Sequence, residues 1–228
     1  MIQAVIFDID NTLYSYDRAH RAAYAALKRY CGEAVGLSPE DFEALHKAAS
    51  RILEQRAGMG PVIHNRLIRY QLMLEEAGLP IAWAPTMAEL YWRGLLGAME
   101  PSPGARQAIL ALKAAGIRIG VGTNMTADWQ FAKLEGLGLL PQVDFLVTSE
   151  ELGAEKPDPR LFLLCAEKAG CPPEACAFVG DSLEKDALAA ARVGMLGIWY
   201  HPEPASPPEG ILPLGDFARL PELILSME

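Results

Sequence analysis

A short apolar run near the start of the chain stops at an acidic residue. Residues 2–7 are mostly aliphatic or aromatic, and Asp8 follows them directly. A run of this length that ends in acidic and turn-forming residues is typical of a strand buried on both faces of a parallel sheet. The pattern therefore predicts a first strand at residues 2–7.

The next eighty or so positions follow the period of an amphipathic helix. Ala19, Ala23 and Leu27, for example, recur at intervals that bring them to one helix face. Glycine and proline residues interrupt the pattern several times, which divides it into four or five predicted helices. We expect a helical unit over residues 16–96, with no strand inside it.

After residue 100 the chain alternates between helical patterns and short apolar runs. This alternation predicts a parallel sheet with helices on both faces. After residue 200 we expect a proline-rich surface loop over residues 201–208 and a short terminal helix. The expected helices are residues 105–115, 129–137, 159–169 and 185–193, and the expected strands are residues 117–122, 145–148, 175–179 and 196–200.

Together these elements predict an α/β fold, a doubly wound parallel sheet interrupted after its first strand by an α-helical cap. The core is expected to contain residues 1–15 and 97–228, and the cap residues 16–96. Right-handed crossovers place the C-terminal ends of the strands along one sheet edge, where ligands of open α/β sheets bind. Polar residues that follow the strands are therefore the first candidates for a functional site.

Composition narrows the class of protein. The 228 residues are 51% hydrophobic, enough for a sizeable core, and the formal net charge is −9. Binding to a nucleic-acid backbone requires a concentrated cationic surface, so we expect no nucleic-acid partner. We expect no membrane partner either, because no apolar run approaches the roughly 20 residues that span a bilayer. The N-terminus lacks signal-peptide features and the four cysteines lack a zinc-ligand spacing, which favours a cytoplasmic protein.

Acidic, hydroxyl, amide and lysine side chains stand where the predicted strands end. Because parallel strands bring these ends to one edge, we expect the side chains to lie close together. The first two are carboxylates two positions apart on an extended segment, so they point to the same side. The residues are Asp8 and Asp10 after the first strand, Thr123 and Asn124 after the second, Lys156 after the third and Asp181 after the fourth.

Taken singly, each of these features has an ordinary alternative. Two acidic residues after a strand also suit a helix cap. A calcium loop of the EF-hand type is excluded, because Leu13 and Ala19 stand where that loop needs Gly and Glu. Thr123 is not part of a dinucleotide fingerprint, because Met125 occupies a position that requires Gly. Lys156 alone is compatible with a solvated surface lysine.

In their order and spacing, Asp8 to Thr12, Thr123-Asn124, Lys156-Pro157 and Gly180 to Asp186 resemble the four motifs of the haloacid dehalogenase-like hydrolases. The resemblance covers nearly the whole chain and points to the subfamily whose helical cap lies between the first two motifs. It implies a Rossmann-like core. It also implies Asp8 as the nucleophile, Asp10 as general acid and base, Thr123 and Lys156 as phosphoryl-binding groups, and Asp181 as a metal ligand.

The implied chemistry requires Mg²⁺, because an anionic nucleophile and a phosphate dianion repel each other unless positive charge surrounds them. Asp8, the backbone carbonyl of Asp10 and Asp181 would hold the ion, and Lys156 would add a second positive charge. Asp10 would protonate the departing alkoxide and later deprotonate the attacking water. The resemblance thus implies a phosphatase that forms an aspartyl-phosphate on Asp8 and hydrolyses a sugar phosphate, a nucleotide or a small acid phosphate.

Substrate contacts are expected from both units. Thr123 and Asn124 would bind phosphate oxygens from the core. In relatives the cap closes over the substrate. Here the candidate contacts are the turn at residues 58–61 and the following His64, Arg66 and Arg69, since arginine suits carboxylate, phosphate and sugar oxygens. Arg66 and Arg69 stand at helical spacing, so a solvated helix face is the alternative interpretation.

Three other functions stay open. A phosphomutase uses the same aspartates with a sugar hydroxyl as acceptor. A haloacid dehalogenase has no need of Asp10, because a halide leaves without a proton, and a non-catalytic phosphate-binding protein has no need of Asp10 as an acid. Asp186 is expected either to partner Lys156 or a metal-bound water, or to lie at a solvated helix start. The expected partner is a small phosphorylated metabolite, and the chain is expected to be a monomer or a homodimer.

Overall fold

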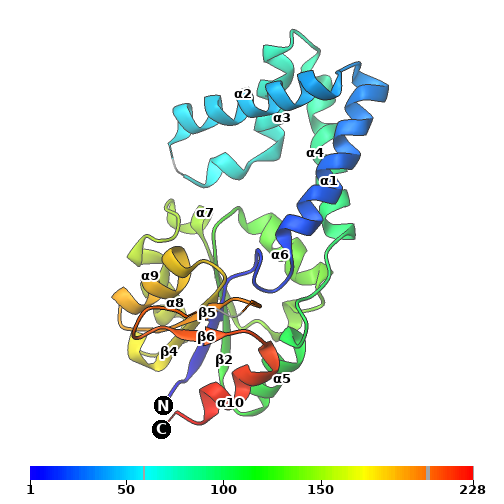
Figure 1. Cartoon of the computed structure of the whole chain (residues 1–228). Helices are drawn as coiled ribbons and strands as arrows, with labels where there is room; N and C mark the ends of the chain where they lie inside the picture. The colour runs from blue at the N-terminus through cyan, green and yellow to red at the C-terminus, as the bar shows by residue number, and fades with distance from the viewer. Residues whose placement is uncertain (59, 204–205, 228) are drawn as a thin grey trace. The chain divides into compact units, whose positions relative to one another are not determined.

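The computed structural model describes residues 1–58, 60–203 and 206–227, and it divides into two compact units (Figure 1). One unit is Met1–Ser15 with Glu100–Glu228, and the other is Tyr16–Met99. The sequence suggested a second boundary after residue 96, but α4 (Ala84–Gly97) extends the helical unit past that position. Residue 59 of the expected contact turn and residues 204 and 205 of the expected loop lie outside the described residues.

The first unit is built on a sheet of six parallel strands in the order β3-β2-β1-β4-β5-β6. The doubly wound parallel fold is therefore confirmed. Chain order reverses between β1 and β4, which makes this gap the topological switch point, where ligands of such sheets bind. The strands are β1 (Ala4–Phe7), β2 (Arg118–Thr123), β3 (Phe145–Thr148), β4 (Cys176–Gly180), β5 (Leu196–Tyr200) and β6 (Leu212–Leu214).

The sixth strand, β6, was not expected from the sequence, which indicated a loop and a helix after residue 200. Its three residues are too few for an alternation of apolar and polar positions to show, and Pro213 argued against a strand. Among the described strands it pairs with β5 alone, in the register Ile198↔Leu212 to Tyr200↔Leu214, so it lies at the edge of the sheet, where proline is tolerated. The expected terminal helix is α10 (Leu220–Leu225).

Helices cover both faces of the sheet, with α8 (Pro159–Ala169) and α9 (Leu188–Arg192) on one face and α5 (Ala105–Ala114) and α10 on the other (Figure 1). The side chains of successive residues in β1 pack alternately against the helices on one face and on the other. Ile6 packs with Phe162 and Phe178, whereas Phe7 lies 6.4 Å from Phe217 between ring centroids. Because both faces are buried, β1 has no polar position until Asp8. The remaining helices of this unit are α6 (Ala127–Gly136) and α7 (Ser149–Leu152).

The second unit consists of α1 (Tyr16–Tyr30), α2 (Pro39–Ala57), α3 (Arg66–Glu76) and α4. Helix α2 begins at Ser38, whose hydroxyl accepts a hydrogen bond from the Asp41 amide at 3.0 Å, with proline at the first helical position. The described residues of this unit include no strand. Within the described part of the chain, no helix combines the length and apolar character needed to cross a bilayer.

Candidate active site

The ends of β1 and β4 bring Asp8 and Asp181 together at the switch point of the sheet. The Asp8 amide donates to the Val179 carbonyl at 2.9 Å, which extends the parallel ladder just past β1. The backbone around Asp181 is fixed on both sides. Its amide donates to the Thr12 hydroxyl at 3.0 Å, and its carbonyl accepts from the Trp199 indole at 2.7 Å. The two carboxylates are therefore carried by rigid elements.

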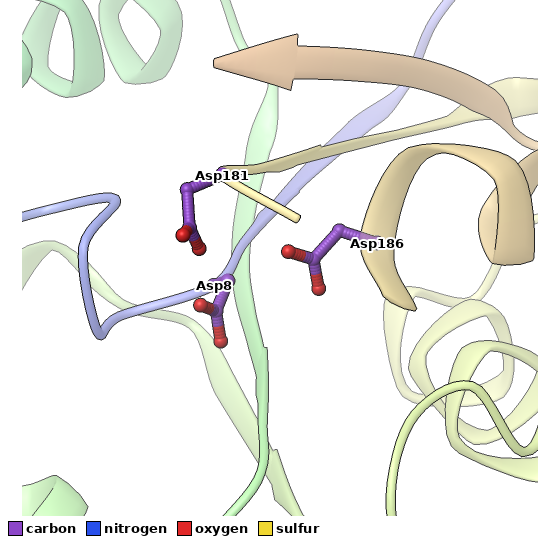
Figure 2. A group of neighbouring side chains, drawn as sticks. All are labelled: Asp8, Asp181 and Asp186. Atoms are coloured by element: carbon purple, nitrogen blue, oxygen red, sulfur yellow. The ribbon is translucent and has the colours of Figure 1, made fainter. Parts of the chain in front are cut away.

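A third carboxylate, Asp186, completes a cluster with Asp8 and Asp181, and Figure 2 shows the three side chains gathered at the ends of the strands. One oxygen from each lies within 4.8 Å of the others. Asp186 is 1% exposed, so the interpretation as a solvated helix start is wrong. The π-helical turn Leu183–Ala187 aims the side chain back toward β4, where the Ser182 amide donates to its Oδ2 at 3.0 Å.

Lys156 connects two of these carboxylates. Its Nζ donates to Oδ1 of Asp8 at 2.6 Å and to Oδ1 of Asp186 at 2.7 Å. The residue is 5% exposed, so the alternative of a solvated surface lysine is also wrong. The Lys156 backbone amide donates to the side-chain oxygen of Asn124 at 2.8 Å, which ties the lysine loop to the end of β2.

The site holds more negative than positive charge. The buried carboxylates of Asp8 and Asp186 and the half-buried carboxylate of Asp181 face one ammonium, which leaves an excess of two negative charges when all three carboxylates are ionised. Burial raises the pKa of Asp8 to about 7, although the charge of Lys156 opposes the shift. Burial and the charge of Asp186 raise the pKa of Asp181 to about 6. Burial also opposes the charge of Lys156, but the charges of Asp186 and Asp8 outweigh it, so the Lys156 pKa lies above its usual range.

This donor set fits a hard divalent cation. All the converging ligand atoms are carboxylate oxygens, which Mg²⁺ prefers, and a charge of +2 would offset the excess. The sequence indicated Asp8, the Asp10 backbone carbonyl and Asp181 as ligands. The structure places Asp8 and Asp181 together, and it adds the carboxylate of Asp186. The Asp10 side chain is not one of the three converging carboxylates.

The carboxylate of Asp10 is held by two residues for which the sequence indicated no role. Lys133, in α6, donates from Nζ to both carboxylate oxygens at 2.7 Å. The Tyr14 hydroxyl donates to Oδ1 at 2.5 Å. The lysine side chain is fully buried, whereas that of Asp10 is 26% exposed. No signal in the sequence marked Lys133, because a lysine in an amphipathic helix normally lies on the solvated face.

Thr123 and Asn124 are held in place by Gln130, another residue that the sequence did not indicate. Gln130 donates from Nε2 to the Thr123 hydroxyl at 2.8 Å and to the Asn124 carbonyl at 2.9 Å. Among the described residues, the Thr123 hydroxyl itself donates only to the Asn124 carbonyl, at a weak 3.4 Å. The next amide, that of Met125, already donates to Ser149 at 2.8 Å. The Thr123 hydroxyl is therefore oriented to accept a hydrogen bond from Gln130, and its own proton makes only a weak hydrogen bond.

The cap residues proposed from the sequence lie in the helical unit. Arg66 is 6% exposed, so a solvated helix face is wrong for this residue. Its guanidinium lies 4.9 Å from the ring centroid of Tyr91 and donates to the Tyr91 and Tyr16 hydroxyls at 3.3 and 3.0 Å. Aromatic rings thus shield its charge from water. His64 ends a 3₁₀ turn, and its carbonyl accepts from Arg66 at 3.3 Å.

Known proteins resemble this chain over most of its length. A family model described as haloacid dehalogenase-like hydrolase matches residues 2–194. Ribulose-1,5-bisphosphate 5-phosphatase of Halopiger xanaduensis is 34% identical over 209 residues, covering 90% of this chain and 87% of that protein. Pyrimidine 5'-nucleotidase YjjG of Escherichia coli is 30% identical over 228 residues, covering 96% and 95%. A solved 2-haloacid dehalogenase from Pseudomonas syringae is 27% identical, with a TM-score of 0.81 and both chains fully covered.

Proposed function

The chain belongs to the haloacid dehalogenase-like hydrolases, and on that premise we propose that it is a Mg²⁺-dependent phosphatase of small phosphate monoesters. The observation that carries the proposal is the cluster of Asp8, Asp181 and Asp186 at the switch point of the sheet, in which Lys156 contacts Asp8 and Asp186. A phosphoryl group at this position would meet a carboxylate nucleophile, a fixed ammonium and a set of oxygen ligands suited to Mg²⁺.

Asp8 is the proposed nucleophile. Its position at the end of the central strand β1 gives it a fixed backbone, and its contact with Lys156 at 2.6 Å supplies positive charge at the attacking oxygen. Attack on phosphorus would form an aspartyl-phosphate and release the alcohol, and water would then release phosphate and restore the carboxylate. The two-step route divides a difficult displacement between two nucleophiles.

Asp8 and Asp181 are the proposed metal ligands, together with the Asp10 backbone carbonyl, and Asp186 lies beside them. Mg²⁺ bound there would neutralise charge that develops on the phosphoryl oxygens. The ammonium of Lys156 would also help to neutralise this charge, since it contacts both Asp8 and Asp186. Thr123 and Asn124 are proposed to bind the remaining phosphoryl oxygens, because Gln130 holds them at the end of β2.

Asp10 is the residue that favours a phosphatase over a dehalogenase. An alkoxide leaving group needs a proton, whereas a halide does not, and Asp10 is the carboxyl proposed to supply and then remove that proton. The two curated relatives described above are named for phosphate ester substrates. A phosphomutase would use the same groups and remains the second candidate function, to be distinguished by isomerisation of a sugar phosphate without release of phosphate.

The cap residues His64 and Arg66 are proposed to contribute to substrate selection. Arg66 carries a charge that no carboxylate of the described residues neutralises at short range. Such a charge would favour substrates that carry a carboxylate or a second phosphate. We also propose a cytoplasmic location, a small phosphorylated metabolite as the partner, and a monomer or homodimer as the assembly.

The test is phosphate release from a panel of phosphorylated metabolites, with and without Mg²⁺, by the wild type and by Asp8→Asn. We expect release that requires Mg²⁺ and falls by at least about 10³-fold in the variant, because the covalent step has no other nucleophile. Glu184→Gln is the matched control, since Glu184 follows β4, as Asp181 and Asp186 do, but its side chain is 72% exposed. Equal release by wild type and Asp8→Asn would contradict the role of Asp8 as the nucleophile. No release across the panel would contradict the proposed phosphatase function.

A further inference from the structure

The most heavily buried positive charge outside the phosphoryl site is that of Lys133. Its side chain has no exposed surface, and both of its shortest contacts, at 2.7 Å, are to the two oxygens of Asp10. Burying a charge is costly unless it is paired. Replacing a whole buried ion pair by apolar residues is often neutral for stability or stabilising, so stability alone does not account for this pair. The lysine therefore calls for a role beyond folding.

We propose that Lys133 is a positioning residue for Asp10, and that with Tyr14 it sets which carboxylate oxygen faces the leaving group of the substrate. This inference rests on the proposed phosphatase function. A carboxyl group rotates about its Cβ–Cγ bond unless both oxygens are held. One ammonium equidistant from the two oxygens, at 2.7 Å, fixes the plane of the group.

Tyr14 makes the two oxygens of Asp10 different. Oδ1 accepts from Tyr14 at 2.5 Å as well as from Lys133, whereas Oδ2 accepts from Lys133 alone among the described residues. Oδ2 therefore keeps a lone pair for the proton that passes to the departing alkoxide. Lys133 and Tyr14 together form a clamp on Asp10. Asp10 is partly exposed while Lys133 is not, so the lysine approaches the carboxyl from the protein interior and leaves its outer side accessible.

The clamp also connects distant parts of the core. Asp10 and Tyr14 lie in the loop that follows β1, where they form an isolated β-bridge. Lys133 comes from α6, 123 positions later in the chain. Gln130, one helical turn earlier in α6, holds Thr123 at 2.8 Å. One face of α6 thus positions both the proton-transfer group and a proposed phosphoryl ligand, and it fixes their positions relative to each other.

The experiment compares two esters that differ in their need for a proton. p-Nitrophenolate leaves without protonation, whereas the alkoxide of an alkyl phosphate does not. We would measure kcat/KM for p-nitrophenyl phosphate and for the alkyl phosphate that wild type hydrolyses best, using wild type, Lys133→Met and Asp10→Asn. We expect Lys133→Met to shift the ratio toward the aryl ester by about tenfold or more, since general acid catalysis contributes about 10²–10⁴-fold.

A double mutant separates positioning from a structural role. In the Asp10→Asn background, Lys133→Met should cause less than about a twofold further loss on the alkyl ester, because residues that act as a unit are not additive. Tyr14→Phe, which removes one hydroxyl, should shift the ratio in the same direction by a smaller factor. Lys113→Met is the control, because Lys113 also pairs with an aspartate of the core, at 2.8 Å, but is 30% exposed.

Two results would overturn the proposal. Equal losses on both esters in Lys133→Met and in Tyr14→Phe would indicate a structural role only. Full additivity of Lys133→Met with Asp10→Asn would show that the lysine does not act through Asp10. A wild type that releases phosphate from neither ester would instead contradict the proposed function itself, and the positioning role would fail with it.

Discussion

Gly180, the last residue of β4, lies where the side chain of Asp186 turns back toward the sheet. A Cβ at this position would lie 2.3 Å from the Asp186 carboxylate oxygen Oδ2, far inside contact distance. The absence of a side chain at Gly180 therefore allows Asp186 to reach Lys156. The requirement is steric, because Gly180 has an ordinary strand conformation.

We expect Gly180→Ala to displace Asp186 and to lower kcat/KM for phosphate release by about tenfold or more, which corresponds to about 1.4 kcal/mol of transition-state free energy. Steady-state kinetics on the best substrate of the panel would measure the loss. Gly97→Ala is the control, since nothing lies within 4 Å of a Cβ at that position. Unchanged kinetics in Gly180→Ala would show that Asp186 is not needed at its observed position.

The residues at strand ends were predictable from the sequence, and those that orient them were not. Asp8 and Asp181 had to meet, because parallel strands end at one edge and the acidic positions directly follow apolar runs. Lys133 and Gln130 carried no such signal, since a polar residue in a helix normally faces water. Their burial depends on the packing of α6 in the folded core, which the one-dimensional pattern does not contain.

Within the cap, α2 and α3 bring a histidine close to two arginines. His46 of α2 lies 6.4 Å from the ring centroid of Tyr70 in α3 and 5.0 Å from that of Tyr24. Burial is the main cause that lowers the His46 pKa to about 4, and the charges of Arg69, Arg66 and His20 add to it, while Glu43 opposes them. Folding therefore keeps His46 neutral over a range in which the unfolded chain would protonate it.

The expected consequence is a loss of stability in acid. Between pH 6.5 and about 4 the unfolded chain binds a proton at His46 that the folded chain does not, so the free energy of unfolding falls as pH falls. His46→Gln should remove on the order of 1 kcal/mol of the difference between pH 7 and pH 5. Thermal melting by far-UV circular dichroism at both pH values would measure it, with His201→Gln as the control. An identical pH dependence in His46→Gln would contradict the shift.

At the scale of elements, the sequence predicted the described α-helices of both units except the four-residue α7, and it predicted five of the six strands. The five had apolar runs of four or more residues, each long enough to show burial on both faces. β6 has three residues, including Pro213, and it exists because β5 offers an unpaired edge. Local pattern cannot reveal a strand whose formation depends on a partner that is already in place.

For the molecule as a whole, the excess negative charge at the sheet edge makes the stability of the folded state depend on bound metal. We expect Mg²⁺ to raise the melting temperature by several degrees, because a ligand of the folded state at a hundredfold its Kd adds about 2.7 kcal/mol. Asp181→Asn should reduce this shift, and its metal-free form should melt no lower than metal-free wild type, since one half-buried charge is removed. Differential scanning fluorimetry with a Mg²⁺ titration would measure both effects.

Glu184→Gln serves again as the control, because its exposed side chain belongs to the same segment as Asp186 without facing the cluster. It should keep the full response to Mg²⁺. A shift of the same size in Asp181→Asn and in wild type would place the stabilising ion elsewhere on the protein.

The helical unit is one unbroken stretch of sequence, Tyr16–Met99, whereas the sheet unit is split around it. Of the described strands, β1 is synthesised first, yet both of its neighbours, β2 and β4, come after the insert. On the ribosome, β1 emerges without a partner while the whole helical unit is translated. The contacts of the central strand are therefore long-range, which slows folding and leaves an apolar segment exposed to chaperones until residues 118–123 follow.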